Sequence, residues 1–272
     1  MTIRPTRRSG LAAEAGVSFR TRRPTLPPVA GDAAPVPVQV DVRGVLRALS
    51  LLTGVMIVMG IVSRVASTTT TDFVGRDVLA NMFALSGEGN MPTYYSSFLL
   101  AMAAAIAWVI ARTKRQVNDR FQRAWLAISA VFVYLSVDEV AQIHERVATG
   151  VRRIVADSAV LHYAWVAPYA LVVLAVIVTF VPFLLHLPRR TAGGMILAGA
   201  LYVLGAMGLE VFEGVLDFEG HFFSVAMAAL VTIEESLEMC SVVLFIGVLL
   251  DYLRRQLPDL HLDLSFIGGR SR

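Results

Sequence analysis

Eight acidic residues lie within or directly beside three apolar stretches that are long enough to cross a bilayer. They are Asp138, Glu139, Glu145, Glu210, Glu213, Glu234, Glu235 and Glu238. A charged side chain inside a bilayer costs several kcal/mol, with figures from ~3 to more than 10. We therefore interpret this group as a functional feature and ask what chemistry it supports.

Helical spacing places several of these acids on shared faces. If the stretch around residues 124–144 is one helix, Asp138, Gln142 and Glu145 are at i, i+4 and i+7 and form one stripe, from which His144 deviates. The pairs that are three residues apart are Glu210 with Glu213 and Glu235 with Glu238. The spacing predicts that three helices each present carboxylates on one side.

Carboxylates that are packed together repel one another, so they must bind a cation, hold protons, pair with arginine or contact water. Arg146, Arg152 and Arg153 are too few to neutralise eight acids. A bound divalent metal is the sharpest interpretation, with His144 and His221 as further candidate ligands. Manganese, iron or zinc would suit such a donor set, or calcium if the histidines do not bind.

Two observations keep other interpretations open. Helical bundles that hold two metals use Glu-x-x-His pairs from facing helices, and this sequence has Glu-x-x-Glu instead. The acids also lie near the predicted membrane boundary, where charge costs less. A proton relay or cation pathway in a transporter, and a structural or solvated rim, are therefore alternatives to the metal site.

The composition indicates that these acids belong to a membrane protein. Of the 272 residues, 56% are hydrophobic and 17% are charged, and the mean hydropathy is +0.65. A soluble domain has about 25% charged residues. Six stretches are long and apolar enough for a membrane span of roughly 20 residues, at about 45–66, 95–113, 124–144, 163–186, 192–213 and 224–250. We predict an all-α, polytopic bundle of six transmembrane helices.

The depth of the acids in these spans agrees with a single site. We count about 20 residues along three spans, starting from their ends at Arg123, Arg190 and Asp251, which lie next to most of the arginine and lysine residues. The three opposite boundaries then fall close to the acidic residues. Three helices are thus predicted to present acid to one layer, on the outer side of the membrane.

The distribution of arginine and lysine predicts the orientation. Nineteen of these residues fall on one side of the six spans and five on the other. Because cytoplasmic loops carry the excess of positive charge, both termini are predicted to be cytoplasmic in a multi-pass protein of the cell (inner) membrane. Residues 1–42 are predicted to be a disordered basic arm rich in proline and arginine, 43–252 the membrane domain and 253–272 a cytoplasmic tail.

A short connecting helix is predicted between the first two spans. Residues 72–85 place Val74, Val78 and Met82 on one helical face. The segment could lie on the outer membrane face as an amphipathic helix or connect two spans on the protein surface.

Several cofactors and partners are excluded by the residues themselves. Lys114 is the only lysine and lies outside the spans, so there is no candidate for a retinal Schiff base. No pair of histidines lies in mid-membrane to clamp haem, and Cys240 alone cannot hold an iron–sulfur cluster. No basic patch is interleaved with aromatics, which argues against nucleic acid. The expected partners are the lipid bilayer and, as an open possibility, other membrane proteins.

Two motifs resemble those of a family of bacterial multi-span membrane proteins. The first runs from Gly87 to Ser97, as GEGNMPTYYSS, and the second from Leu135 to Glu145, as LSVDEVAQIHE. The resemblance spans about residues 45–250 and implies a class of protein without a mechanism. If the first motif belongs to the acidic site, Glu88 and Asn90 would act as its lid; the alternative is a turn that only caps the second span.

The leading hypothesis is an integral membrane protein that binds a metal ion and acts as an enzyme at the outer leaflet. The alternatives are a cation- or proton-coupled transporter and a non-catalytic accessory subunit of a membrane complex. A transporter needs a polar path that continues inward, and the sixth span offers only Ser241 on the inner side of Glu238 before an apolar run. This favours a closed site over a pathway.

Overall fold

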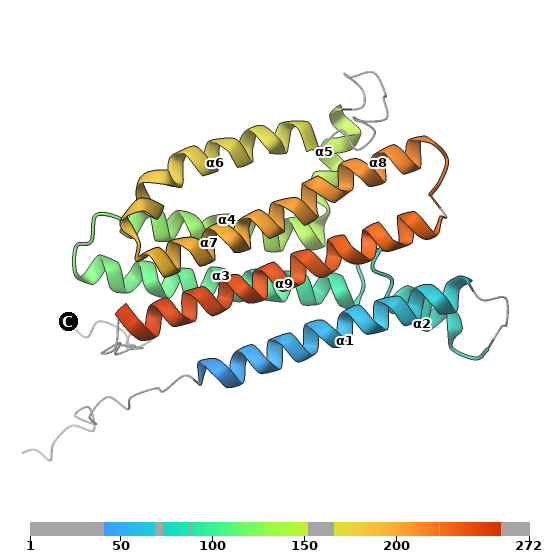
Figure 1. The fold of residues 1–272 in the computed structure, drawn as a ribbon, viewed down its shortest axis with the longest axis horizontal. Coiled ribbons are helices and arrows are strands. Elements are labelled where there is room, and N and C mark those ends of the chain that lie inside the picture. The colour runs from blue at the N-terminus through green and yellow to red at the C-terminus, as the bar shows by residue number, and fades with distance from the viewer. Residues whose placement is uncertain (1–40, 69–72, 88, 152–165, 223, 257–272) are drawn as a thin grey trace, which may run out of the picture. The chain divides into compact units, whose positions relative to one another are not determined.

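The computed structural model describes residues 41–68, 73–87, 89–151, 166–222 and 224–256, which fold into a helical bundle without strands (Figure 1). The elements are α1 (Val42–Thr68), α2 (Arg76–Met82), α3 (Met91–Gln116), α4 (Gln122–Ala141), α5 (Ile143–Val151), α6 (Val166–His186), α7 (Arg189–Val203), η2 (Leu204–Leu209), α8 (Glu210–Phe218) and α9 (Val225–Gln256). The predicted basic arm, apart from its last two residues, and most of the predicted tail lie outside the described residues.

Six helical segments of this bundle are long and apolar enough to cross a membrane, which confirms the predicted all-α, six-span fold. The fifth segment is continuous over 189–218, because α7, η2 and α8 follow one another without a break. The helix of the third span, predicted over about 124–144, runs from Gln122 to Ala141.

Helices α3 and α9 form the centre of the bundle, since half of the apolar window of each is buried. Helix α3 packs closely on α4 through small residues, as is common between membrane helices. Ser97 Oγ donates to the carbonyl of Ser136 at 2.8 Å, and Ser136 Oγ donates to the carbonyl of Ser97 at 2.9 Å. Ser129 Oγ likewise donates to the carbonyl of Ala104 at 2.9 Å. These contacts fix the height of α4 against α3.

The connecting helix predicted over 72–85 is present and shorter, as α2. Ser63 Oγ of α1 donates to the carbonyl of Ala80 at 2.8 Å, which holds α2 beside α1. The buried Leu85 lies against Gly60, where any Cβ would collide with its side chain. Val78 and Met82 of the predicted apolar face are exposed.

Helix α6 is the least buried span, and only 6% of its apolar window lies inside the bundle. Figure 1 shows α6 running apart from its neighbours along its middle. Its two ends are anchored on α4: the ring of Phe183 lies edge-on to Trp125 with 5.0 Å between centroids, and the Tyr169 hydroxyl hydrogen-bonds that of Tyr134. Between these two anchored ends, α6 lines a cavity with Val173, Val176 and Phe180.

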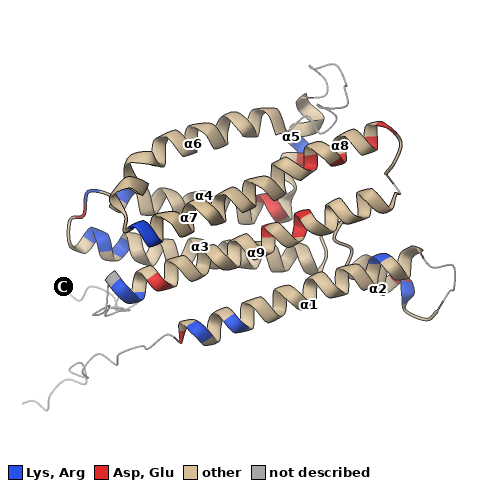
Figure 2. Ribbon diagram, viewed as in Figure 1, with Lys and Arg blue, Asp and Glu red and all other residues tan. Residues whose placement is uncertain are grey.

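The charges of the bundle are distributed unequally between its two ends. Figure 2 shows lysine and arginine gathered where α1 begins, α3 ends, α4 and α7 begin and α9 ends. We call this end the basic end. The acids of α4 and α8 and the glutamates of α9 lie toward the opposite half, whereas Asp251 of α9 pairs with Arg254 and Arg255 at the basic end. The helices thus alternate in direction, as six spans require. Which end faces the cytoplasm stays a prediction.

An ion pair at the basic end joins the last turn of α3 to the turn that follows it. Lys114 Nζ lies 3.1 Å from Asp119 Oδ2, and Asp119 Oδ1 accepts from the backbone N–H of Phe121 at 2.8 Å. Burial raises the pKa of the Asp119 carboxyl, but these two bonds and the nearby His186 outweigh it and hold the pKa below its usual value.

Candidate functional site

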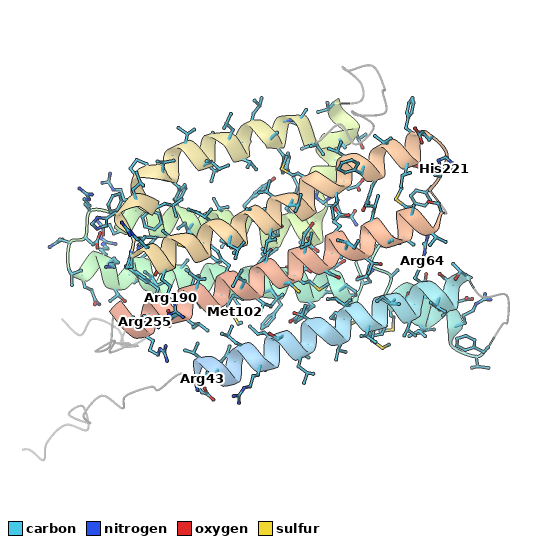
Figure 3. The ribbon with its side chains drawn as sticks, in the orientation of Figure 1. Arg43, Arg64, Met102, Arg190, His221 and Arg255 are labelled. Carbon is cyan, nitrogen blue, oxygen red and sulfur yellow. The ribbon has the colours of Figure 1, made fainter. Side chains whose placement is uncertain are left out.

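A cavity of about 1590 Å³ runs from the half of the bundle that holds the acids along α6 toward the basic end, where Leu184 and Met195 line it. All eight acidic residues singled out above line it, together with His144. They come from α4, α5, α8 and α9, so carboxylates that are a hundred residues apart in sequence share one space. Figure 3 shows the side chains between these helices.

His221 is the one candidate ligand that the structure keeps away from the cavity. It lies in the turn after α8, where its side chain is 59% exposed and its Nδ1 is 3.7 Å from Glu219 Oε2 (Figure 3). The sequence placed it near the acids because only two residues separate it from the end of α8.

A break between α4 and α5 brings Asp138 and His144 together. Gln142 adopts the left-handed conformation with φ 54°, so the helix ends and the chain turns. The backbone N–H of His144 then donates to Asp138 Oδ1 at 2.9 Å, and His144 Nδ1 lies 3.2 Å from Asp138 Oδ2. The predicted stripe of Asp138, Gln142 and Glu145 on one continuous helix is therefore wrong. The residue that was expected to deviate from it, His144, is the partner of Asp138.

The fifth span reaches the acidic residues through a π-helical turn. Element η2 directly precedes Glu210, and such single π turns within α-helices are frequent at functional sites. Gly205 within it lies against α9: a Cβ there would be 3.2 Å from the carbonyl oxygen of Glu234 and 3.2 Å from Cγ of Glu238. The absence of a side chain at residue 205 thus allows the two acidic helices to approach closely.

Glu213 is the most buried glutamate of the cavity, at 6% exposure. Its carboxyl group faces that of Glu234 at hydrogen-bonding range, which requires a proton or a cation between them. Its Oε1 atom is buried and has no hydrogen-bond partner. A buried carboxylate oxygen without a partner is costly, so a proton or a cation at this atom would be stabilising.

Glu238 lies close enough to carboxylates of all three spans to be repelled by them. It interacts electrostatically with Glu235 of its own helix and with Glu139, Glu210 and Glu213 of the others. Toward the basic end the cavity wall of α9 changes character: Ser241 Oγ donates to the carbonyl of Glu238 at 2.8 Å, and Val242 and Phe245 follow.

A family model described as "Domain of unknown function (DUF8692)" matches residues 48–253. The chain belongs to this family. The match spans the six apolar helices and every acidic residue of the cavity, while the predicted arm and most of the predicted tail fall outside it. Neither the curated proteins nor the solved structures contain a match to the chain.

Asn90, within the matched region, caps helix α3 and does not line the cavity. Its Oδ1 accepts from the backbone N–H of Thr93 at 3.2 Å, and its amide donates to the carbonyls of Ala84 and Gly87 at 2.6 Å each. Asn90 is thus the N-cap of α3, as the capping alternative predicted. Glu88, the other predicted lid residue, lies outside the described residues.

The donors of the cavity fit a hard divalent ion in type, although they are not gathered into a ligand shell. Among the described residues, no three of the His, Cys, Asp and Glu side chains are close enough together to hold a metal ion. Carboxylate oxygens with one imidazole are the donors that manganese, iron, zinc or calcium sites use. The unpartnered Oε1 of Glu213 is the observation in favour of the fit.

Sequence reasoning missed one side of the cavity. Arg64 and Asn81, from α1 and α2, line the same space as the acids. Neither residue belongs to a motif or to an acidic stripe, and Arg64 was interpreted only as a determinant of orientation. Their position depends on how α1 packs against α9 and how α2 packs against α1, which the sequence pattern does not specify.

Proposed function

We propose that this protein is an integral membrane protein of the cell (inner) membrane that binds a divalent metal ion among the carboxylates of its cavity. We further propose that it uses the ion as a metal-dependent enzyme at the outer side of the membrane. One observation carries the proposal: carboxylates of three spans line one cavity, and a buried oxygen of Glu213 among them has no partner.

Glu213, Glu234 and Glu238 are the residues that would hold the ion. They interact electrostatically across α8 and α9, and binding would have to draw their carboxylates together, because no three such side chains of the described residues are close enough to hold an ion as they stand. A cation between them would offset their repulsion and supply the missing partner of Glu213. Such an ion would act as a Lewis acid on a substrate oxygen.

His144 is the candidate nitrogen ligand of the same ion. The Nδ1 contact with Asp138 is the kind of carboxylate contact that orients ligating histidines in metal sites. The turn at Gln142 holds both residues at the cavity wall. Asp138 is then a positioning residue, which fixes the ring orientation of His144.

A proton-coupled transporter is the second candidate, and the close approach of Glu213 to Glu234 favours it. Two carboxyl groups at hydrogen-bonding range can share a proton in place of a metal. The apolar wall that follows Glu238 on α9 argues against it, because protons need polar groups or water to continue. We therefore rank it below the metal site.

The test is the thermal stability of the purified protein in detergent, after treatment with a chelator and after addition of Mn²⁺. Binding at about 100 times Kd should raise the melting temperature by about 5 °C or more. Glu238→Gln should weaken or abolish this response, because it removes one negative ligand and keeps the shape. Glu219→Gln is the matched control, since Glu219 is exposed and lies outside the cavity.

The opposite result would reverse the ranking of the two candidates. A natural protein that responds to neither chelator nor Mn²⁺, together with a Glu238→Gln variant that melts at a higher temperature, would refute the metal site. Replacement of one acid by an amide would then remove its repulsion of the neighbouring carboxylates when they ionise, and the fold would be stabilised.

A further inference from the structure

We infer that the ligand of this cavity is an amine-bearing membrane lipid. Its hydrocarbon chain lies in the apolar part of the cavity beside α6, and its headgroup reaches the carboxylates. The inference rests on the proposed function for the acidic end of the cavity and adds the class of substrate.

The cavity is apolar where it extends along α6. The face of α6 that turns toward the bundle lines it with Val173, Val176, Phe180 and Leu184. Met195 lines it from α7 on the other side. A hydrocarbon chain is the ligand that such a surface binds, since burial of apolar area is its only favourable contact.

The cavity is also open toward the bilayer between α6 and the fifth span. Ile177 of α6 lines it and is 54% exposed, while Ile196 and Leu204 of the fifth span line it and are 56% and 51% exposed. Side chains that border both the cavity and the lipid-facing surface mark a lateral entrance. The entrance lies between the two anchored ends of α6, Tyr169 and Phe183.

The size of the cavity indicates a ligand larger than most small molecules. Its volume is about 1590 Å³, whereas pockets for drug-sized ligands are about 300–1,000 Å³. Interiors of folded proteins contain few voids larger than a water molecule. An apolar space of this size within the membrane is therefore expected to hold lipid.

The charge of the cavity selects the headgroup. Eight acidic residues line it, and Arg64 is the one arginine or lysine among the described residues that do so. Even with a divalent ion bound and protons held between the closest acids, Arg64 does not balance the remaining carboxylates, so an anionic headgroup would be repelled. An ammonium group would pair with the carboxylates of the cavity wall that the ion does not bind.

Photolabelling in lipid nanodiscs tests the inference. The probes are phosphatidylethanolamine and phosphatidylglycerol that carry the same diazirine in the acyl chain, diluted into phosphatidylcholine. The amine-bearing probe should label the inward residues Val173 and Phe180 at least threefold more than the anionic probe. Both probes should label the outward residues Leu171 and Leu174 equally, since those residues face bulk lipid.

Two variants provide the matched comparison. Val176→Trp fills the apolar part of the cavity and should abolish inward labelling, whereas Val178→Trp, on the outward face of α6, should preserve it. Unchanged outward labelling shows that each variant is folded. If Val176→Trp does not fold, Val173→Phe is the smaller obstruction, read by labelling at Phe180.

The outcomes separate the two proposals. Outward labelling without inward labelling in the natural protein overturns the lipid chain, and equal inward labelling by both probes overturns the amine. Val176→Trp should keep its response to Mn²⁺. A protein that shows amine-dependent inward labelling without any response to Mn²⁺ would refute the metal and leave the lipid.

Discussion

The carboxylate of Asp138 holds both the backbone and the side chain of His144, with Oδ1 2.9 Å from the backbone nitrogen and Oδ2 3.2 Å from Nδ1. Six residues separate the two, and the chain turns between them at Gln142. In a continuous helix the backbone N–H of His144 would donate to the carbonyl four residues earlier. Here the side chain of Asp138 accepts this hydrogen bond instead and so caps the first turn of α5.

The first prediction follows from this contact. Asp138→Ala should speed amide hydrogen exchange in residues 143–151 by about tenfold or more, because a hydrogen bond to a charged group contributes about 1.5–3 kcal/mol. Asp138→Asn should restore most of the protection, since its side-chain oxygen can still accept from the His144 N–H. Exchange measured by mass spectrometry decides this, with Asp77→Ala as an exposed control. Unchanged exchange in Asp138→Ala would refute the contact.

A second prediction concerns the contact between η2 and α9. Gly205→Ala should lower the melting temperature by several degrees, because its Cβ would press on the backbone carbonyl of Glu234 and on Glu238. Gly199→Ala is the matched control within the same span, since a Cβ there meets nothing within 4 Å. It should be neutral or stabilising by up to about 1 kcal/mol, as glycine is a poor helix former. Equal stability of the two variants would contradict the packing.

The third prediction is a dependence of stability on pH at the basic end. The pKa of Asp119 is lowered in the folded protein, so its stabilising contribution is present above the usual pKa of an aspartate, about 4, and is lost as the pH falls through the lowered value. The natural protein should therefore lose more stability below about pH 4 than Asp119→Asn does. Thermal melts over this pH range measure the difference, and parallel curves would count against the ion pair with Lys114.

The fourth prediction is the orientation in the membrane. Reporters fused after Arg272 or inserted after Arg189 should be cytoplasmic, and one near Ala156 should be external, because nineteen basic residues fall on one side and five on the other. A C-terminus on the external side, with the N-terminus in the cytoplasm, would refute the prediction of six spans, because an even number of spans leaves both termini on the same side.

The spans were predictable because hydropathy and length are summed over some 20 residues, so single errors average out. The acidic layer was predictable for the same reason, since counting along three spans needs only the helical rise. The break after Ala141 was not, because glutamine rarely adopts a left-handed conformation and no glycine marks the position. The approach of Arg64 to the cavity depends on packing between distant helices, which no local pattern encodes.

The π-helical turn has a consequence for insertions and deletions along the fifth span. A π turn contains one residue more than the α-helical turn it replaces, so 204–209 accommodates an additional residue without breaking the span. Loss of one residue there would restore a uniform α-helix and leave the direction of everything after it nearly unchanged, because the π turn spreads its extra residue over about the same rotation. A further inserted residue that stayed in α-helical geometry would instead rotate everything after it by about 100° relative to α7. Glu210 and Glu213 would then leave the cavity wall while every apolar residue of the span stayed in the membrane.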